Sequence, residues 1–262
     1  MNRKRFIIVI IYCTCGIFSF VSCSNFQKKP DDKVIIAFID SACSKETYER
    51  LLEVLWKPDD IKISGDKRNH CDYVLKAFES TLAGQDINYE IMLLNALDEN
   101  GECLIEGLIE AIKFAEKNGA MICNLSLSTY TDNRKLKSVI EQSDMLFVAA
   151  AGNEGENLDE GFPSFPTNWE LENVISVAAT DENQNLLEIS NYGGKTVDIA
   201  MNGVIEIDGE IVEGTSIAAG RMSAVVAGIL SSSEKNIVTS NDKKEVLSFV
   251  NNKCFQKIYE ML

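Results

Sequence analysis

The sequence predicts an α/β protein of three layers, in which a mostly parallel central sheet is covered by helices on both faces. Two observations support this prediction. Beyond residue 33, short apolar runs typical of strands buried on both faces alternate with longer segments whose apolar residues follow helical spacing. Strands separated by helices of this length are joined by right-handed crossovers, which make neighbouring strands parallel.

The elements are predicted in order along the chain. Apolar runs indicate five strands, at residues 33–40, 87–97, 120–128, 145–153 and 173–180. Helical spacing indicates helices at residues 45–55, 103–119 and 133–142 and within residues 213–230. Gly119 ends the second helix, because glycine adopts the left-handed conformation that follows many helices. A hairpin is predicted at residues 204–212, with its turn at Asp208–Gly209.

Composition places these elements in one folded domain. The chain has 262 residues, of which 45% are hydrophobic and only 4 are proline, and it contains no visible internal repeat. Its net charge of −15 at pH 7 argues against a nucleic-acid partner, because phosphate contacts need clustered Lys and Arg.

The N-terminus is typical of an export signal. A basic head is followed by an apolar run and small residues, so residues 1–22 are predicted to be a signal peptide. The stretch "FVSC" resembles a bacterial lipobox, although Phe20 stands where Leu is usual. The resemblance implies that Cys23 is lipidated, that residues 23–32 form a short tether, and that residues 33–262 form a membrane-anchored domain in the cell envelope. An uncleaved anchor and ordinary secretion are the alternatives.

The cysteines do not indicate a metal site. Beyond the signal and Cys23, five remain, an odd number for an exported chain: Cys43, Cys71, Cys103, Cys123 and Cys254. No pair of Cys or His residues has zinc-ligand spacing.

Polar residues follow three of the predicted strands. Asp40 ends the first, Ser126 to Ser128 end the third, and Gly152–Asn153 follow the fourth. Open parallel sheets bind ligands at the carboxyl ends of their strands, so this edge is the predicted functional edge. Ser216 lies in the first turn of the last predicted helix, where it serves either as a cap or as a reactive residue beside free N–H groups.

His70 is the only histidine in the chain. A lone histidine is more often structural or exposed than catalytic, so His70 alone indicates no chemistry. The residues around it and around the other polar positions are more specific.

Together these segments resemble the subtilisin-like serine proteases (subtilases, peptidase family S8). The resemblance rests on "VIIAFIDSA" with Asp40, "NHCDYV" with His70, "AAAGNEG" with Asn153 and "GTSIAA" with Ser216. It covers about residues 33–232, and the chain order Asp, His, Ser is the subtilisin order. The resemblance implies a subtilisin-like fold and hydrolysis of peptide bonds.

The resemblance also implies a role for each of these residues. Ser216 attacks the peptide carbonyl, while His70 accepts its proton and later donates it to the leaving amine. Asp40 orients the imidazole and stabilises the imidazolium. The side chain of Asn153 and the backbone N–H of Ser216 bind the oxyanion.

The family's substrate contacts are carried over in the same way. Ser126, Leu127 and Ser128 pair with the substrate backbone, and Ala151–Gly152 line the first specificity pocket. Gly161 is expected near the base of this pocket, and Phe162–Pro163 is expected to be a cis peptide.

Four acidic residues crowd the segment beside the predicted pocket, namely Glu154, Glu156, Asp159 and Glu160. Either they belong to a solvated loop, or they give the pocket a preference for basic residues near the cleavage point.

Several residues depart from the family pattern. Ala42, Cys71 and Ser128 place side chains where the family has glycine. Asp72 stands where the family has threonine, Met201–Asn202 where it has alanine and proline, and Gly220 where it has proline. Asp72 is expected either to compete with Asp40 for the imidazole or to raise its pKa. Cys43 and Cys71 flank the predicted Asp and His, which suggests a disulfide between them.

Two function classes follow. The first is an active endopeptidase, in one version a protease that matures a dedicated secreted peptide; the second is a pseudoprotease that binds peptides in the same groove. No cofactor is required for the chemistry, and structural calcium is common among relatives, although the sequence offers no ligand set for it. Only Ser24 to Asp32 separate the lipid site from the first strand, so the domain either folds unaided or has a separate folding partner. An esterase of the α/β-hydrolase type would need G-x-S-x-G, which "GTSIA" is not.

Overall fold

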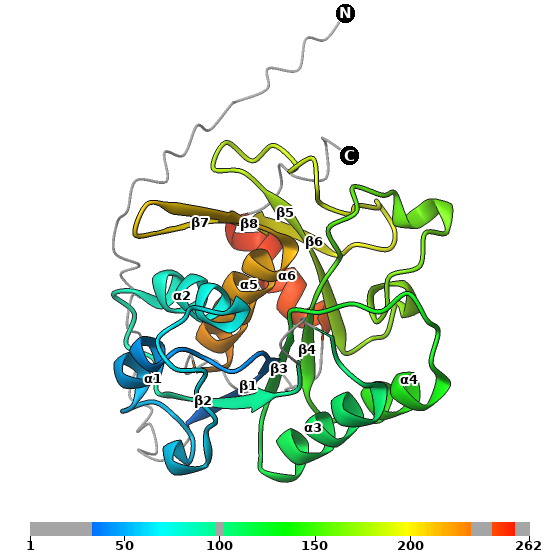
Figure 1. Ribbon diagram of the computed structural model, residues 1–262. Helices are drawn as coiled ribbons and strands as arrows, with labels where there is room; N and C mark the ends of the chain where they lie inside the picture. Colours follow the sequence, from blue (N-terminus) through cyan, green and yellow to red (C-terminus); the bar gives the residue numbers. More distant parts are fainter. Residues whose placement is uncertain (1–32, 98–101, 232–242, 255–262) are drawn as a thin grey trace, which may run out of the picture.

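The computed structural model describes residues 33–97, 102–231 and 243–254. Six parallel strands form one sheet in the order β2-β1-β3-β4-β5-β6, and helices cover both of its faces (Figure 1). The strands are β1 (Val34–Asp40), β2 (Tyr89–Asn95), β3 (Ile122–Leu125), β4 (Leu146–Ala150), β5 (Val174–Thr180) and β6 (Ile199–Asn202). A separate antiparallel hairpin consists of β7 (Val204–Ile207) and β8 (Glu210–Glu213).

Helices lie on both faces of the sheet. They are α1 (Lys45–Leu51), α2 (His70–Leu82), α3 (Ile105–Lys117), α4 (Arg134–Glu141), α5 (Thr215–Ser231) and α6 (Lys243–Cys254). Helices α2 and α5 pack on one face of the sheet, whereas α3 and α4 lie on the other (Figure 1). Single turns of 3-10 helix occur at Pro58–Asp60, Leu158–Glu160 and Thr167–Trp169.

Strand β1 shows how an apolar run supplies both layers of the core. Successive side chains of a strand point to opposite faces of the sheet. Ile36 and Phe38 therefore join the core beneath α2 and α5, while Ala37 and Ile39 join the core beneath α3 and α4. A strand covered in this way has to be apolar at every position, which is the pattern that predicted it.

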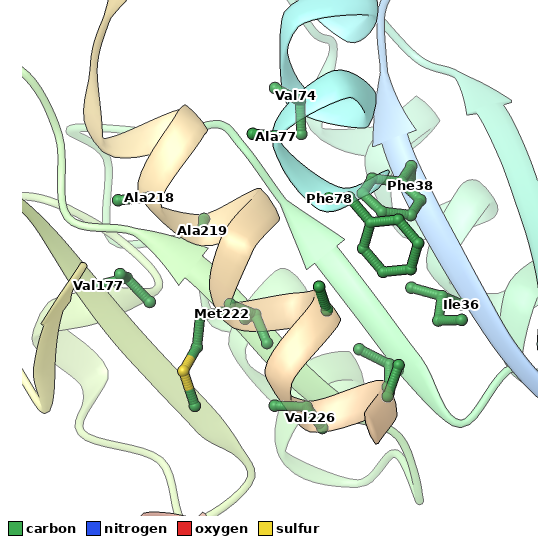
Figure 2. Packing of buried hydrophobic residues seen from close by; sticks show 14 of the residues in the cluster. Ile36, Phe38, Val74, Ala77, Phe78, Val177, Ala218, Ala219, Met222 and Val226 are labelled. Carbon is green, nitrogen blue, oxygen red and sulfur yellow. The ribbon is translucent and has the colours of Figure 1, made fainter. Parts of the chain in front are cut away.

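Helix α5 crosses the sheet and is buried over most of its length. Figure 2 shows Ala219 and Met222 of this helix among the apolar side chains of α2 and the neighbouring strands. A Cβ atom added to Gly220 would lie 2.8 Å from the carbonyl oxygen of Val74 in α2. Glycine at this position thus allows α5 to approach the backbone of α2.

The predicted fold class is confirmed, and the five predicted strands are present with shorter ends. The helix expected at residues 45–55 ends at Leu51, and the chain then runs along the edge of β2, where the Trp56 N–H donates to the carbonyl oxygen of Ile91 (2.8 Å). Helix α2, strand β6 and helix α6 were not predicted. Strand β6 has only 4 residues, too few for an apolar pattern to stand out.

The predicted export signal, the lipidation site at Cys23 and the tether lie outside the described residues. Within the residues that the structure does describe, no helix combines the length and the apolar character needed to cross a membrane.

Candidate active site

Asp40 and His70 come from different elements and are in direct contact. Asp40 ends β1 with a side chain only 1% exposed, and His70 is the first residue of α2. The His70 Nδ1 atom lies 2.8 Å from Asp40 Oδ1 and 3.0 Å from Oδ2. Because a carboxylate only accepts hydrogen bonds, Nδ1 carries the proton and donates it, which leaves Nε2 as the free nitrogen of the neutral ring.

The charge of Asp40 alters the basicity of the imidazole. Desolvation lowers the pKa of His70, but the negative charge of Asp40 and its hydrogen bond together outweigh this effect, so the pKa is raised above the usual histidine value. The Ser41 backbone N–H donates to Asp40 Oδ1 (2.7 Å) and helps to fix the carboxylate. The His70 side chain is 41% exposed, so its outer edge is open to water.

Asp72 does not compete for the imidazole, contrary to the expectation from sequence. Its Oδ1 atom accepts hydrogen bonds from the backbone N–H and the hydroxyl of Ser44, both at 2.9 Å. Its Oδ2 atom accepts from the backbone N–H of Asn69 at 2.6 Å and so completes a capping box at the start of α2. Asp40 is the only charged residue that contributes to the raised pKa of His70. Asp72 therefore stabilises the start of α2, the helix that carries His70.

The suggested disulfide between Cys43 and Cys71 is absent, because both residues are free thiols. Both are buried, and burial is the main reason that the pKa of Cys43 is raised to about 11 and that of Cys71 is raised as well. Thiols with such pKa values are neutral and poorly nucleophilic at neutral pH.

Ser216 lies in the first turn of α5 and is 8% exposed. Its hydroxyl donates to the carbonyl oxygen of Ser126 at 3.2 Å, and the hydroxyl of Ser126 donates to the carbonyl oxygen of Ser216 at the same distance. Among the hydrogen bonds of the described residues, none joins Ser216 to His70. The serine is held beside the end of β3, with its hydroxyl turned toward Ser126.

Asn153 is fixed through its side-chain oxygen. Its Oδ1 atom accepts from the backbone N–H and the hydroxyl of Thr215, both at 2.9 Å. Thr215 Oγ1 in turn accepts from the Gly152 N–H at 3.2 Å. The Nδ2 group of Asn153 donates to no other described residue, so its N–H groups are available beside the first turn of α5. An oxyanion donor needs N–H groups that are free in this way.

The segment expected to bind the substrate backbone extends beyond β3. At its far end Thr129 exchanges two backbone hydrogen bonds with Phe165, at 3.0 and 2.9 Å. The backbone groups of Leu127 and Ser128 bond to no other described residue. They are thus available for pairing with an extended peptide.

Ser164, and not Gly161 as predicted from the sequence, lies next to Ala151 and Gly152 at the expected base of the first specificity pocket. The hydroxyl of Ser164 donates to the carbonyl oxygen of Ala151 at 2.7 Å, and its side chain is fully buried. Gly161 is exposed and follows the 3-10 turn Leu158–Glu160. The cis peptide bond is Phe165–Pro166, so the expectation of a cis bond at Phe162–Pro163 is wrong. Two Phe-Pro pairs lie three residues apart, and the prediction chose the first.

Gly152 has a conformation that excludes other residues. Its φ angle is +108°, and an added Cβ would lie 2.4 Å from Asn191 Nδ2 and 2.6 Å from Glu154 Oε2. Asn191, which sequence reasoning missed, donates to the carbonyl oxygen of Ala151 at 3.0 Å and to Glu154 Oε2 at 2.6 Å. Asn191 therefore holds the predicted pocket wall and the glutamate beside it together.

The four acidic residues near the pocket are not equivalent. Glu154 accepts hydrogen bonds from Asn191 and from the Tyr130 hydroxyl (2.7 Å), so it lies beside the predicted pocket. Asp159 faces another loop, where a hydrogen bond from the Thr196 hydroxyl (2.7 Å) is the main cause of its lowered pKa. Glu160 accepts from the Asn157 side chain at 3.0 Å. Glu156 reaches the surroundings of Gly152 only through its backbone N–H, which donates to Asn191 Oδ1 at 2.9 Å, so among the four only Glu154 places its carboxylate there.

In the ranges that the structure describes, no group of three or more His, Cys, Asp or Glu side chains is arranged to hold a metal ion. No side-chain set for calcium is therefore identified in this part of the chain.

Comparison with known proteins identifies the family. Residues 63–251, more than half of the chain, match the model described as the subtilase family, Peptidase_S8. The chain belongs to the subtilase family. Asp40 lies N-terminal to the matched segment, so its assignment rests on the motif and on its contact with His70.

Curated relatives support this membership at moderate identity. The chain is 32% identical over 187 residues to the "Thermophilic serine proteinase" of Bacillus sp. (strain AK1), covering 66% of this chain and 45% of the relative. It is 30% identical over 140 residues to "Thermitase" of Thermoactinomyces vulgaris, covering 51% and 48% of the two chains. The matches thus span about half the length of these relatives.

Solved structures show the same fold. A structure of a cold adapted subtilisin-like serine proteinase has a TM-score of 0.66 and 21% identity, covering 84% of this chain and 81% of its own. A structure of a lanthipeptide protease has a TM-score of 0.65 and 20% identity, covering 84% and 79%.

Proposed function

We propose that this protein is a serine endopeptidase that uses Asp40, His70 and Ser216 as its catalytic triad. The observation that carries the proposal is the bond between Asp40 and His70, together with the placement of Ser216 and Asn153 at the start of α5. Membership of the subtilase family supports the same reaction.

The reaction begins when the Ser216 hydroxyl leaves the Ser126 carbonyl and transfers its proton to Nε2 of His70. The serine oxygen attacks the peptide carbonyl, and Asp40 stabilises the imidazolium through Nδ1. The negative oxygen of the tetrahedral intermediate accepts hydrogen bonds from Asn153 Nδ2 and the Ser216 backbone N–H. His70 then donates its proton to the leaving amine, and water completes hydrolysis of the acyl-enzyme.

The proposed substrate is an extended peptide. Leu127 and Ser128 offer unpaired backbone groups, and Ala151, Gly152 and Ser164 surround the place for the side chain before the cleaved bond. Glu154 adds a preference for a basic side chain there, because it accepts hydrogen bonds from neutral groups and has no ion-pair partner among the described residues. The solved lanthipeptide protease is a neighbour whose name gives a peptide substrate, which supports maturation of a dedicated secreted peptide.

We also propose that the enzyme acts outside the cytoplasm, anchored to a membrane through a lipid on Cys23. The basic and apolar N-terminal stretch and the lipobox-like "FVSC" support this location. Radiolabelled palmitate incorporation that persists in a Cys23→Ala variant would contradict it.

A fluorophosphonate probe tests the reaction without knowledge of the substrate. We expect the wild-type protein to be labelled and the Ser216→Ala and His70→Ala variants not to be labelled. Ser248→Ala, which removes an exposed serine of α6, should label like the wild type. A folded wild-type protein that remains unlabelled would favour the alternative of a catalytically impaired peptide-binding protein.

A further inference from the structure

A chain of buried polar side chains leads from the interior of α5 to the proposed nucleophile. The Ser223 hydroxyl donates to Asn124 Oδ1 at 3.0 Å, and Asn124 Nδ2 donates to Ser126 Oγ at 2.8 Å. The Ser126 hydroxyl donates to the carbonyl oxygen of Ser216 at 3.2 Å. Ser223 and Asn124 are fully buried, and Ser126 is 5% exposed, so these groups depend on one another for hydrogen bonds.

The direction of these hydrogen bonds follows from the first of them. The Ser223 hydroxyl donates to the oxygen of the Asn124 amide, so the nitrogen of the amide faces Ser126. Because Ser126 Oγ accepts from this nitrogen, its own proton is directed to Ser216. Without the Ser223 hydroxyl, the buried Asn124 oxygen would lack its partner, which is a costly state. A half-turn of the amide would not remove the cost, because its nitrogen would then lack a partner, so the amide loses the contact that fixes it against Ser126.

Ser126 holds Ser216 on two sides. Its hydroxyl donates to the Ser216 carbonyl, and its carbonyl accepts from the Ser216 hydroxyl. The same residue begins the segment Ser126–Ser128, which is proposed to pair with the substrate. The position of Ser126 therefore sets the distance between the nucleophile and the bound peptide.

We propose that Asn124 and Ser223 are positioning residues, which act through Ser126 to hold Ser216 in register with the substrate segment. The proposal rests on the proposed function. Neither residue touches the reacting atoms; their effect is on the placement of Ser216, and small errors in placement reduce rates strongly. Ser223 lies two turns into the helix and reaches β3 through Asn124, so the helix and the sheet are locked together at this point.

The test compares Ser223→Thr with Ser223→Val, two variants of similar size that differ in the hydroxyl group. Both enlarge the side chain at a buried position, so any cost of overpacking is shared. We expect the rate constant for fluorophosphonate labelling to be ~10-fold or more lower in Ser223→Val than in Ser223→Thr, by analogy with the rate cost of misplaced groups. On a fluorogenic tetrapeptide amide, kcat should fall while KM changes by about twofold at most.

A matched control is Ser176→Ala, which removes a similarly buried hydroxyl that bonds to Asp198 and Thr196 and makes no hydrogen bond to Ser126 or Ser216. It should label at the wild-type rate even where its thermal stability is reduced. Equal labelling of the two Ser223 variants, with an active wild type, would overturn the positioning role. An unlabelled wild type would instead overturn the proposed function.

Hydrogen exchange of the peptide that contains Thr215–Gly220 gives a readout independent of activity. We expect faster exchange in Ser223→Val than in Ser223→Thr, because Ser216 loses its bond to Ser126. Equal exchange in both variants would contradict the proposed effect of Ser223 on Ser216, whatever the activity of the protein.

Discussion

The two halves of the proposed triad differ in how their side chains are held. On one side, Asp40 and His70 are in direct contact, and the capping box around Asp72 fixes the start of α2. On the other side, two hydrogen bonds join Ser216 to Ser126, and the Ser216 hydroxyl donates to Ser126 instead of His70. The acid–base pair is therefore assembled in the free protein, whereas the nucleophile has to exchange its hydrogen bond before it can react.

Replacing Asp40 with Asn should break the assembled half and have the largest effect. The amide cannot stabilise the imidazolium and favours the wrong tautomer; in another serine protease the equivalent change lowers kcat by about 10⁴. We expect a loss of similar size in kcat/KM, together with a lower His70 pKa, because the charge of Asp40 raises it. Asp181→Asn, in an exposed loop, is the control; a loss below about tenfold in Asp40→Asn would contradict the role.

Replacing Asn153 with Ala should weaken the Ser216 half. It removes the free N–H groups that face the first turn of α5, and the loss of such an oxyanion donor lowers kcat by about 10²–10³ in subtilisin. KM should change little, because the interaction forms mainly in the transition state. Steady-state kinetics with a fluorogenic peptide measures both constants. A variant that raised KM alone would indicate a role in substrate binding instead.

Gly220 lies where the two halves of the proposed triad pack together, because it lets α5, which carries Ser216, approach α2, which carries His70. In Gly220→Ala the new Cβ would lie 2.8 Å from the Val74 carbonyl oxygen, so the helices have to separate. We expect the free energy of unfolding to fall by ~1–3 kcal/mol, the usual cost of overpacking. Urea denaturation measures the loss. Gly107→Ala in α3, where an added Cβ meets nothing within 4 Å, should be neutral or stabilising, and the reverse ranking would contradict this role of Gly220.

Glu154→Gln should alter specificity and leave the triad unchanged. Removing the charge beside Gly152 should lower kcat/KM for a peptide with arginine before the cleaved bond by roughly fivefold, the equivalent of a charge interaction of about 1 kcal/mol in a solvated site. The matched peptide with glutamine should be cut equally well by both forms. Glu160→Gln, in the same acidic segment, should change neither ratio. Equal cleavage of both peptides by the wild type would remove the proposed preference.

The smallest effect concerns pH and separates activity from stability. Because the folded-state pKa of His70 is raised, its stabilising contribution is fully present below about pH 6.5, the ordinary imidazole value, and is lost as the pH rises through the folded-state pKa. Activity should rise over the same interval, since the neutral imidazole accepts the serine proton. Profiles of kcat/KM and of the urea midpoint against pH, with His70→Gln as control, test whether activity rises while stability falls. An acid limb below the ordinary value would contradict the raised pKa.

The sequence predicted the groups that carry the chemistry better than the groups that place them. Asp40, Asn153 and Ser216 stand in short stretches typical of one family, and they lie at the predicted edge of the sheet. Sequence reasoning did not find helix α2, although Asn69 and Asp72 are spaced as a capping pair. Ser223 appeared only as one small residue among others in a buried helix, and its partner Asn124 becomes evident only when α5 lies against β3.

The pocket shows a second limit of the sequence. Glycine in the family pattern suggested Gly161 for the pocket base, but Ser164 fills this place, since the segment that reaches Ala151 is the one immediately before the second Phe-Pro pair. The alignment of two similar dipeptides three residues apart cannot be resolved by local pattern. It depends on the backbone pairing of Thr129 with Phe165, which is a contact between distant segments.

The contrast in exposure between His70, at 41%, and Asp40, at 1%, has a consequence for the second half of the reaction. No described segment has to move before water reaches the imidazole, while the Asp40 carboxylate behind it is buried. Once the amine product has left, a hydrolytic water molecule can approach the base directly from bulk solvent. The proposed reaction therefore needs no gate among the described residues for its second substrate, water, and the acyl-enzyme is open to hydrolysis once the amine has left.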